Sequence, residues 1–224
     1  MNNYFPNDYQ AFIHTSRYAK WLDSENRREN WAETVDRYVD NLVLPKIKDD
    51  VTVFALREAI YNLDVMPSMR AMMSSGKAFD RDNTAGYNCS YLPVDDIRSF
   101  DEAMFILLCG TGVGFSVERQ YVSKLPEVPM NLINLDERIV VPDSKEGWAY
   151  SLRTLILSLY RGFIPKWDVT QVRPAGAKLK TFGGRASGPA PLVDLFQFVI
   201  SKFKEASGEK LTSLQCHDIM CKIG

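Results

Sequence analysis

Cysteines are the residues of this chain best suited to redox chemistry, and four are present: Cys89, Cys109, Cys216 and Cys221. No two of them form a Cys-x-x-Cys pair. Cys89 stands where a polar turn, DRDNTAGYN, passes into a short extended run, CSYLPV. An isolated cysteine is more often a small buried hydrophobe than a reactive thiol. The residues alone therefore favour packing for Cys89 and leave chemistry as the alternative.

A metal site is the second chemistry to consider. His217 and Cys221 are four residues apart in LQCHDIMCKIG, a segment that the pair Thr212 and Gln215 predicts to be a capped helix. Zinc usually takes four ligands, and the only other histidine is His14. We therefore expect helix packing here and no metal site.

Three glycines, Gly110, Gly112 and Gly114, follow the predicted helix 100–109 and precede an alternating run, FSVE. Phosphate-binding turns of the dinucleotide type have the order strand, glycines, helix. The order here is reversed, so we expect no dinucleotide fold. Glycines at a strand start instead let a ligand or another backbone approach closely. For Cys109, beside this turn, we expect packing.

The segment 169–191, VTQVRPAGAKLKTFGGRASGPAP, has no helical or strand periodicity. It holds four glycines, three prolines and four cationic side chains: Arg173, Lys178, Lys180 and Arg185. A loop of this length inside a compact domain is usually functional or disordered. Flexible backbone with positive charge suits an anion such as a nucleotide phosphate. Composition alone allows a solvated surface loop equally well.

Several helices must position these residues. Apolar periodicity predicts helices at 15–22, 29–43, 51–63, 100–109, 143–161, 192–208 and 214–224. Ser99 and Glu102 have the spacing of a capping box. The residue before a proline disfavours helix, so VMPSMRAMMSSG is predicted to be a loop or strand edge.

Composition narrows the class of protein. With 224 residues, 46% of them hydrophobic, the chain can bury a sizeable core. A net charge of −1 excludes a generally basic nucleic-acid binder. The start is polar, and no run approaches the ~20 apolar residues of a membrane span. We expect no membrane partner, no nucleic-acid partner, and a reducing, cytoplasmic location with free thiols.

Six motifs, taken together, resemble the large catalytic chain of ribonucleotide reductases. In order they are MPSMR, NCSYLPVDD, CGTGVGFSVER, DSKEGW, VRPAGAKLKTFGGRASGPAPL and LTSLQCHDI. The chain is most similar to the adenosylcobalamin-dependent (class II) ribonucleoside-triphosphate reductases, from SRYAKWL onward. The resemblance implies an α/β fold: an N-terminal helical region, 1–62, and then, over 63–224, the first half of a ten-stranded α/β barrel, incomplete here.

The resemblance also implies roles for individual residues. Cys89 matches the N-terminal cysteine of the redox pair that reduces the ribose and becomes a disulfide. Substrate contacts are implied for Ser68, Asn88, Gly112, Val113 and Gly114. Contacts with an allosteric effector are implied for Asp96, Arg119 and the specificity-loop residues Arg173, Pro174, Lys178, Lys180, Thr181, Gly183, Gly184 and Arg185.

The implied activity is reduction of ribonucleoside triphosphates to 2′-deoxyribonucleotides by a thiyl-radical mechanism. The implied partners are the ribonucleotide substrate, a dNTP or ATP effector, a thioredoxin-type or dithiol reductant and the C-terminal half of the reductase. Adenosylcobalamin would be bound mainly by that half. The family continues past CKIG, so we expect a fragment or one half of a split gene, inactive alone.

Two alternatives stay open at this point. The chain could be part of a class I reductase large subunit, whose radical comes from a metal-containing small subunit. It could also be a non-catalytic nucleotide-binding or assembly module. The stretch 128–142 is short where monomeric members carry a large insertion, which leaves the oligomeric state open.

Overall fold

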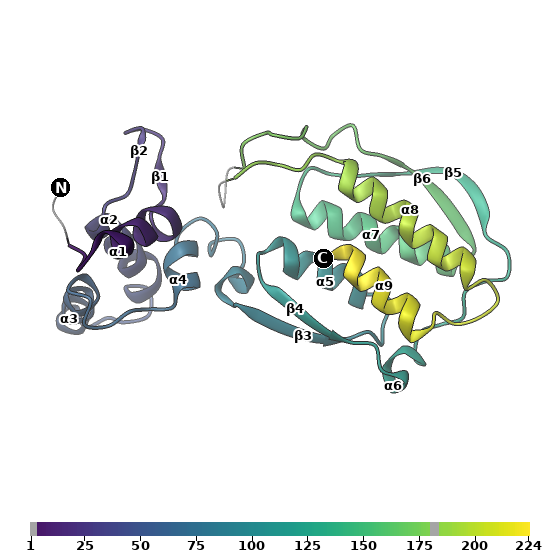
Figure 1. Ribbon diagram of the computed structural model, residues 1–224, viewed down its shortest axis with the longest axis horizontal. Coiled ribbons are helices and arrows are strands. Elements are labelled where there is room, and N and C mark those ends of the chain that lie inside the picture. The colour runs from purple at the N-terminus through teal and green to yellow at the C-terminus, as the bar shows by residue number, and fades with distance from the viewer. Residues whose placement is uncertain (1–3, 180–183) are drawn as a thin grey trace. The chain divides into compact units, whose positions relative to one another are not determined.

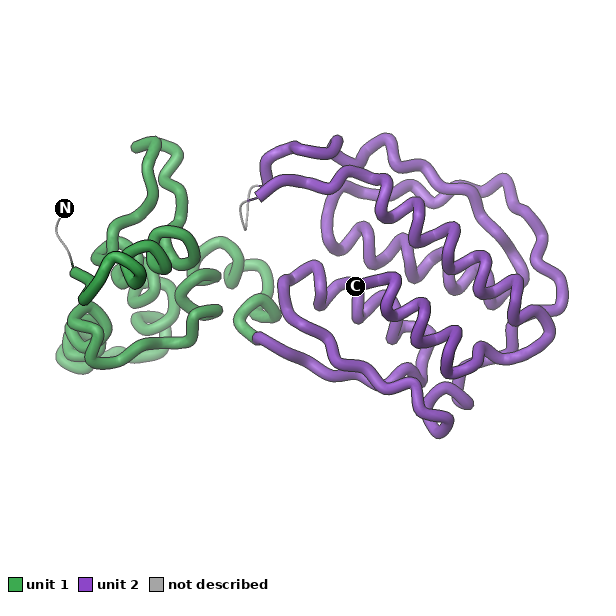
Figure 2. Tube along the Cα trace, viewed as in Figure 1, with its two compact units in different colours: residues 1–87 green, residues 88–224 purple. Residues whose placement is uncertain are grey.

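The computed structural model describes residues 4–179 and 184–224. The chain forms two compact units, residues 1–87 and 88–224, which Figure 2 shows in green and purple. The structure thus groups 63–87 with the N-terminal helices. The division after residue 62, drawn from the family resemblance, remains a prediction about domains of the complete enzyme.

The first unit is mostly helical (Figure 1). Its elements are α1 (Asp8–Ile13), η1 (His14–Tyr18), β1 (Trp21–Leu22), β2 (Arg27–Arg28), α2 (Trp31–Tyr38), η2 (Val39–Val43), α3 (Asp50–Tyr61), α4 (Met69–Ser74) and η3 (Asn83–Gly86). A capping box of Asn30 and Glu33 starts α2, and Asp49 caps α3. The helices predicted at 29–43 and 51–63 are confirmed. Trp31, Val35 and Met72 lie in their common core.

Two predictions in this unit are wrong. The helix predicted at 15–22 ends at Tyr18, because the backbone of the next residues finds partners across the β1–β2 hairpin. There, Lys20 N donates to the Glu29 carboxylate at 3.0 Å. The segment predicted to be a loop contains α4, since Pro67 restricts only the residue before it. The Met and Ala residues that follow favour helix.

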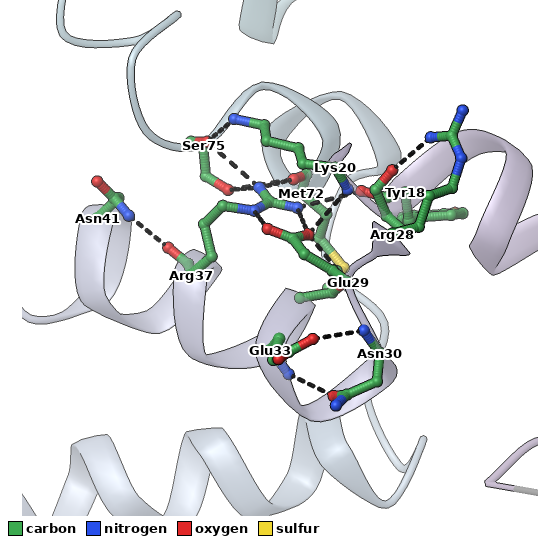
Figure 3. Close-up of polar contacts among 12 residues, drawn as sticks. Tyr18, Lys20, Arg28, Glu29, Asn30, Glu33, Arg37, Asn41, Met72 and Ser75 are labelled. Atoms are coloured by element: carbon green, nitrogen blue, oxygen red, sulfur yellow. Dashed lines mark hydrogen bonds and ion pairs between the residues drawn. The ribbon is translucent and has the colours of Figure 1, made fainter. Parts of the chain in front are cut away.

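A buried polar network joins α2 to α4 (Figure 3). The guanidinium of Arg37 donates to both oxygens of Glu29, and also to the carbonyls of Tyr18, Met72 and Ser75. The Met72 and Ser75 carbonyls lie at the C-terminal end of α4, where a helix favours a cation. Arg37 thereby fixes the helix that Ser68 begins.

The second unit contains two strand–helix–strand units. The first is β3 (Cys89–Pro93), α5 (Ser99–Leu108) and β4 (Gly112–Ser116); the second is β5 (Ile133–Val140), α7 (Lys145–Tyr160) and β6 (Phe163–Asp168). In each, the strands pair in parallel. The remaining elements are α6 (Arg119–Val122), α8 (Ala190–Glu205) and α9 (Ser213–Ile223). Figure 1 shows the long helices between the two strand pairs.

This unit is mixed α/β, and its described strands form two-stranded sheets with no closed barrel. Its core comes mainly from the helices and includes Phe100, Leu152, Phe196, Phe203 and Ile219. The helices predicted around α5, α7, α8 and α9 are confirmed, as is the Thr212–Gln215 capping box.

The capping box predicted at Ser99 and Glu102 is wrong. Ser99 is the first residue of α5, and its hydroxyl donates to the Pro93 carbonyl at 3.0 Å. Glu102 pairs with Arg98 at 3.1 Å. The hydroxyl thus fixes the turn between β3 and α5, a contact that helix spacing does not indicate.

Candidate functional site

Cys89 lies on the exposed face of the β3–β4 pair. The parallel register places Cys89 opposite Gly112 and Tyr91 opposite Gly114. Exposure alternates along both strands, as expected where successive side chains point to opposite faces. The exposed face therefore carries one thiol, one aromatic ring and two glycines; we call Cys89, Tyr91, Gly112 and Gly114 the glycine face.

The two glycines on this face are not required by the fold of the described residues. Neither has a left-handed backbone conformation. A Cβ built on Gly112 would lie 3.4 Å from the Asn88 carbonyl oxygen, and one on Gly114 would lie 3.6 Å from that of Ser90. Both are close to ordinary contact distances, so alanine could be accommodated. The missing side chains leave room for a group that approaches from outside the sheet.

The opposite face of the pair is anchored in the core. Val113, Phe115 and Leu92 pack against the main cluster of unit two. Gly112 N donates to the Asn88 carbonyl at 2.9 Å, and the Ser90 hydroxyl donates to the Gly112 carbonyl at 3.1 Å. The strand that carries Cys89 is therefore held rigidly on one side and is open on the other.

The four cysteines differ in environment. Cys89 and Cys221 are exposed, whereas Cys109 and Cys216 are buried. Burial raises the pKa of the Cys216 thiol to about 12, and Lys145 Nζ donates to Cys109 Sγ at 3.0 Å. The packing expected for Cys109 and Cys216 is confirmed. Thiol–disulfide chemistry needs an accessible sulfur, so Cys89 and Cys221 are the candidates.

Cys221 lies one helical turn from His217, with Sγ 3.6 Å from Nε2. The described residues contain no group of three or more side chains that could hold a metal ion. Within the described part of the chain, no helix is long and apolar enough to cross a membrane.

Asp96 and Arg119 lie just beyond the C-terminal ends of β3 and β4. Because the strands are parallel, these ends share one edge of the sheet. Asp96 Oδ1 accepts from Arg98 N at 2.8 Å and stabilises the turn into α5. Arg119 begins α6 and is exposed. The structure brings both residues to the edge where open α/β sheets commonly bind ligands.

The cationic loop is partly ordered by its own backbone. Leu179 N donates to the Gly184 carbonyl, Ala186 N to Ala177 and Gly176 N to Ala186, and Lys178 pairs with Arg185 as a β-bridge. Gly184 has a φ of +86°, which favours glycine. The predicted residues Lys180, Thr181 and Gly183 lie outside the described residues. Pro174 begins the turn, and its carbonyl accepts from Ala177 N.

Two of the loop cations are held by protein oxygens. Arg173 Nε donates to both carboxylate oxygens of Asp143, at 2.9 and 2.8 Å. Arg185 Nη1 donates to the Gly176 carbonyl at 2.8 Å. Asp143 directly precedes Ser144, the N-cap of α7, so the loop base is fastened to the start of that helix. An anion that uses Arg173 must compete with Asp143.

Ser68 lies in the first unit, at the N-cap position of α4, where its carbonyl accepts from Met72 N at 3.0 Å. Val113 lies in β4 with its side chain on the core side, so a substrate contact from it would come from its backbone. Sequence reasoning missed Tyr91 and Asp143. The two-residue spacing from Cys89 could have revealed Tyr91, whereas nothing local indicates that Asp143 pairs with Arg173.

The second unit thus combines a mixed α/β fold with an accessible thiol on a glycine-lined strand pair. The family model described as "B12-dependent ribonucleotide reductase, insertion domain" matches residues 133–202. A segment similar to the insertion domain of this family is therefore present at residues 133–202. It overlaps the stretch 128–142, where the sequence predicts that the large insertion of monomeric members is short.

Relatives and one solved structure match most of the chain. The adenosylcobalamin-dependent ribonucleoside-triphosphate reductases of Lactobacillus gasseri and Lactobacillus helveticus are 28% and 29% identical to it, over 92% of this chain and 38% of theirs. The crystal structure of a B-12 dependent (class II) ribonucleotide reductase superposes with a TM-score of 0.80 and 25% identity, over 95% of this chain and 39% of that one.

The chain is therefore a partial homologue of adenosylcobalamin-dependent, class II ribonucleotide reductases, similar to the N-terminal part of these enzymes. It spans about 38% of the length of the curated relatives that it matches.

The glycine face by itself does not fit the cobalamin cofactor of these relatives, because its four residues are exposed on a two-stranded sheet and enclose no ligand. A hollow of about 940 Å³ lies between the β5–β6 pair and α8, lined by Arg138, Lys166, Trp167 and Lys204 among others. Its lining combines charged and apolar side chains and includes no member of the glycine face.

Proposed function

We propose that this chain supplies part of the active site of a ribonucleoside-triphosphate reductase, the activity named for its relatives. The observation that carries the proposal is the exposed Cys89 thiol, held opposite Gly112 on a rigid parallel strand pair. The remaining part of a ten-stranded barrel, with the radical-bearing thiol and the cobalamin, would come from polypeptide beyond these residues.

The role proposed for Cys89 is that of a reductant. In the overall reaction the ribose C2′–OH bond breaks and the hydroxyl leaves as water. Cys89 and a second thiol supply two electrons and two hydrogens, one of which forms the new C2′–H bond, and the two sulfurs form a disulfide. An external dithiol then reduces the disulfide. A thiol in this role must reach the sugar, which agrees with the exposure of Cys89.

The other predicted residues have supporting positions in the proposal. Asn88, Gly112, Val113 and Gly114 would contact the substrate beside the thiol, and Ser68 is a further substrate contact that the family resemblance implies. Asp96, Arg119 and the loop 173–187 would bind a dNTP or ATP effector. Asp96 and Arg119 share a position at the C-terminal ends of β3 and β4, and the loop is positively charged; both observations support this assignment.

The test combines this chain with the C-terminal part of the reductase from the same source. The mixture is assayed for conversion of ribonucleoside triphosphates with adenosylcobalamin, a dithiol and varied dNTP effectors. We expect a cobalamin-dependent deoxyribonucleotide product. Cys89→Ser should abolish turnover with dithiol, and Cys221→Ser should leave it unchanged, because Cys221 is an exposed thiol outside the glycine face.

Product formation that survives Cys89→Ser would overturn the role of this thiol. A stable complex without cobalamin-dependent product would contradict the reductase proposal and favour a nucleotide-binding or assembly module.

A further inference from the structure

Tyr91 is the one large side chain of the glycine face, and the function proposed above does not use it. It is 63% exposed, whereas the large and partly apolar side chain of a tyrosine is usually at least partly buried. It lies two residues beyond Cys89 on the same strand, hence on the same side of the sheet, about 6.6 Å further along. Its opposite residue is Gly114, which has no side chain to cover the ring.

A second tyrosine lies beside this ring. The phenol of Tyr121, from α6, lies near that of Tyr91, and this proximity raises the pKa of Tyr121. The hydroxyl end of Tyr91 thus lies toward α6. A large, flat ring that is mostly exposed, on a side chain with few rotatable bonds, is suited to stacking on a flat aromatic ligand at little cost in ordering entropy.

The spacing matches a nucleoside. The base of a nucleoside is attached to C1′, the carbon bonded to the C2′ carbon that loses its hydroxyl. A sugar placed beside Cys89 and over Gly112 therefore has its base within reach of the next exposed position along the strand, which is Tyr91 beside Gly114. Alanine at Gly112 or Gly114 would occupy the space that such a ligand needs.

We propose that Tyr91 is a substrate-binding residue whose ring stacks on the base of a ribonucleotide that lies across Gly112 and Gly114 with its sugar beside the Cys89 thiol. This inference rests on the proposed function and deepens it. Stacking contacts every base through its π-face, so Tyr91 contributes affinity for all four ribonucleotides and little selection among them.

The test uses this chain itself and measures how fast iodoacetamide alkylates each cysteine, by peptide mass spectrometry. Ribonucleoside triphosphates should slow alkylation of Cys89 and leave Cys221, the other exposed thiol, unaffected. Tyr91→Ala should raise the nucleotide concentration needed for protection at least about fivefold, because base–aromatic stacking is lost. Tyr91→Phe, which keeps the ring, should protect nearly as well as the parent chain.

Two controls separate stacking from other effects. Tyr150→Ala removes a tyrosine of almost equal exposure, 62%, from α7 and should change nothing. Inorganic triphosphate, which has no base, should not protect Cys89. Any of three results would overturn the proposal: equal protection by inorganic triphosphate, equal protection in Tyr91→Ala, or no selective protection of Cys89. If Tyr91→Ala does not fold, Tyr91→Phe and the comparison of nucleotide with inorganic triphosphate decide the question.

The outcomes also separate this inference from the proposed function. Selective, Tyr91-dependent protection without turnover in the completed enzyme would keep the binding inference and reject the reductase. Turnover whose KM does not change in Tyr91→Ala would keep the reductase and reject the role of Tyr91. If both hold, Tyr91→Ala should raise KM for the ribonucleotide more than it lowers kcat.

Discussion

Arg37 and Glu29 form a bidentate ion pair inside the first unit, with Nε 2.8 Å from Oε1 and Nη2 2.9 Å from Oε2 (Figure 3). Their side chains are only 12% and 5% exposed. The same guanidinium reaches the C-terminal carbonyls of α4, the helix that Ser68 begins. The pair therefore links the N-terminal helices to a segment that carries a predicted substrate contact.

Breaking this pair should destabilise the first unit strongly. Arg37→Met leaves the Glu29 carboxylate buried without its charge partner, which typically costs about 3–5 kcal/mol. Chemical denaturation followed by circular dichroism measures the loss. Arg98→Met is the matched control, since the Arg98–Glu102 pair is 60% and 47% exposed and such pairs contribute about 0.3–0.5 kcal/mol. Equal losses in both variants would contradict the buried role of Arg37.

A pH dependence should arise from His14. Burial lowers its pKa below the ordinary value of 6.5, with Arg37 acting in the same direction and Glu29 opposing. The unfolded chain then binds a proton more readily than the folded one. The contribution of neutral His14 to the free energy of unfolding is fully present above pH 6.5 and is lost as pH falls from 6.5 toward the lowered pKa of the folded state.

The free energy of unfolding should therefore fall less between about pH 7.5 and about pH 5 in His14→Gln than in the parent chain. His217→Gln changes an exposed histidine and should leave the pH profile as it is. A profile unchanged by His14→Gln would show that His14 does not carry this dependence.

The sequence predicted much of the second unit because its helices are long and amphipathic. It missed β5, whose residues are mostly exposed and include three consecutive charged ones, and β6, which contains a proline. Both strands are defined by their pairing with each other. It also missed α4 in the first unit, where a single proline outweighed helix-forming neighbours. Family motifs located Cys89 and the glycines, whereas the Asp143–Arg173 pair depends on residues thirty apart that only the fold brings together.

Substitution by alanine should lower the free energy of unfolding at Gly147 but leave it nearly unchanged at Gly114. A Cβ on Gly147 would lie 2.6 Å from the Pro142 carbonyl oxygen, so the turn before α7 must shift and Gly147→Ala should cost about 1–3 kcal/mol. Gly114→Ala meets only the Ser90 oxygen at 3.6 Å and should leave the free energy of unfolding within about 0.5 kcal/mol. Under the proposed function, Gly114→Ala should nevertheless lower turnover in the completed enzyme. Strong destabilisation by Gly114→Ala would show that this glycine serves the fold instead.

The ion pair between Asp143 and Arg173 should control the order of the cationic loop more than the stability of the unit. Both side chains are about one-third exposed, so the pair contributes little to global stability. Asp143→Asn removes the charge that fastens the loop base to the start of α7, and trypsin should then cut the loop 173–187 faster while the unfolding midpoint stays nearly constant. Asp136→Asn breaks an exposed ion pair between Asp136 of β5 and Lys166 of β6 and is the matched control, with no expected effect on loop cleavage. If the loop binds an anionic effector through Arg173, Asp143→Asn should also lower the effector concentration needed for half-maximal response, because the effector no longer competes with a carboxylate. Unchanged cleavage in Asp143→Asn would show that the backbone bonds of Gly176, Leu179 and Ala186 hold the loop without this pair.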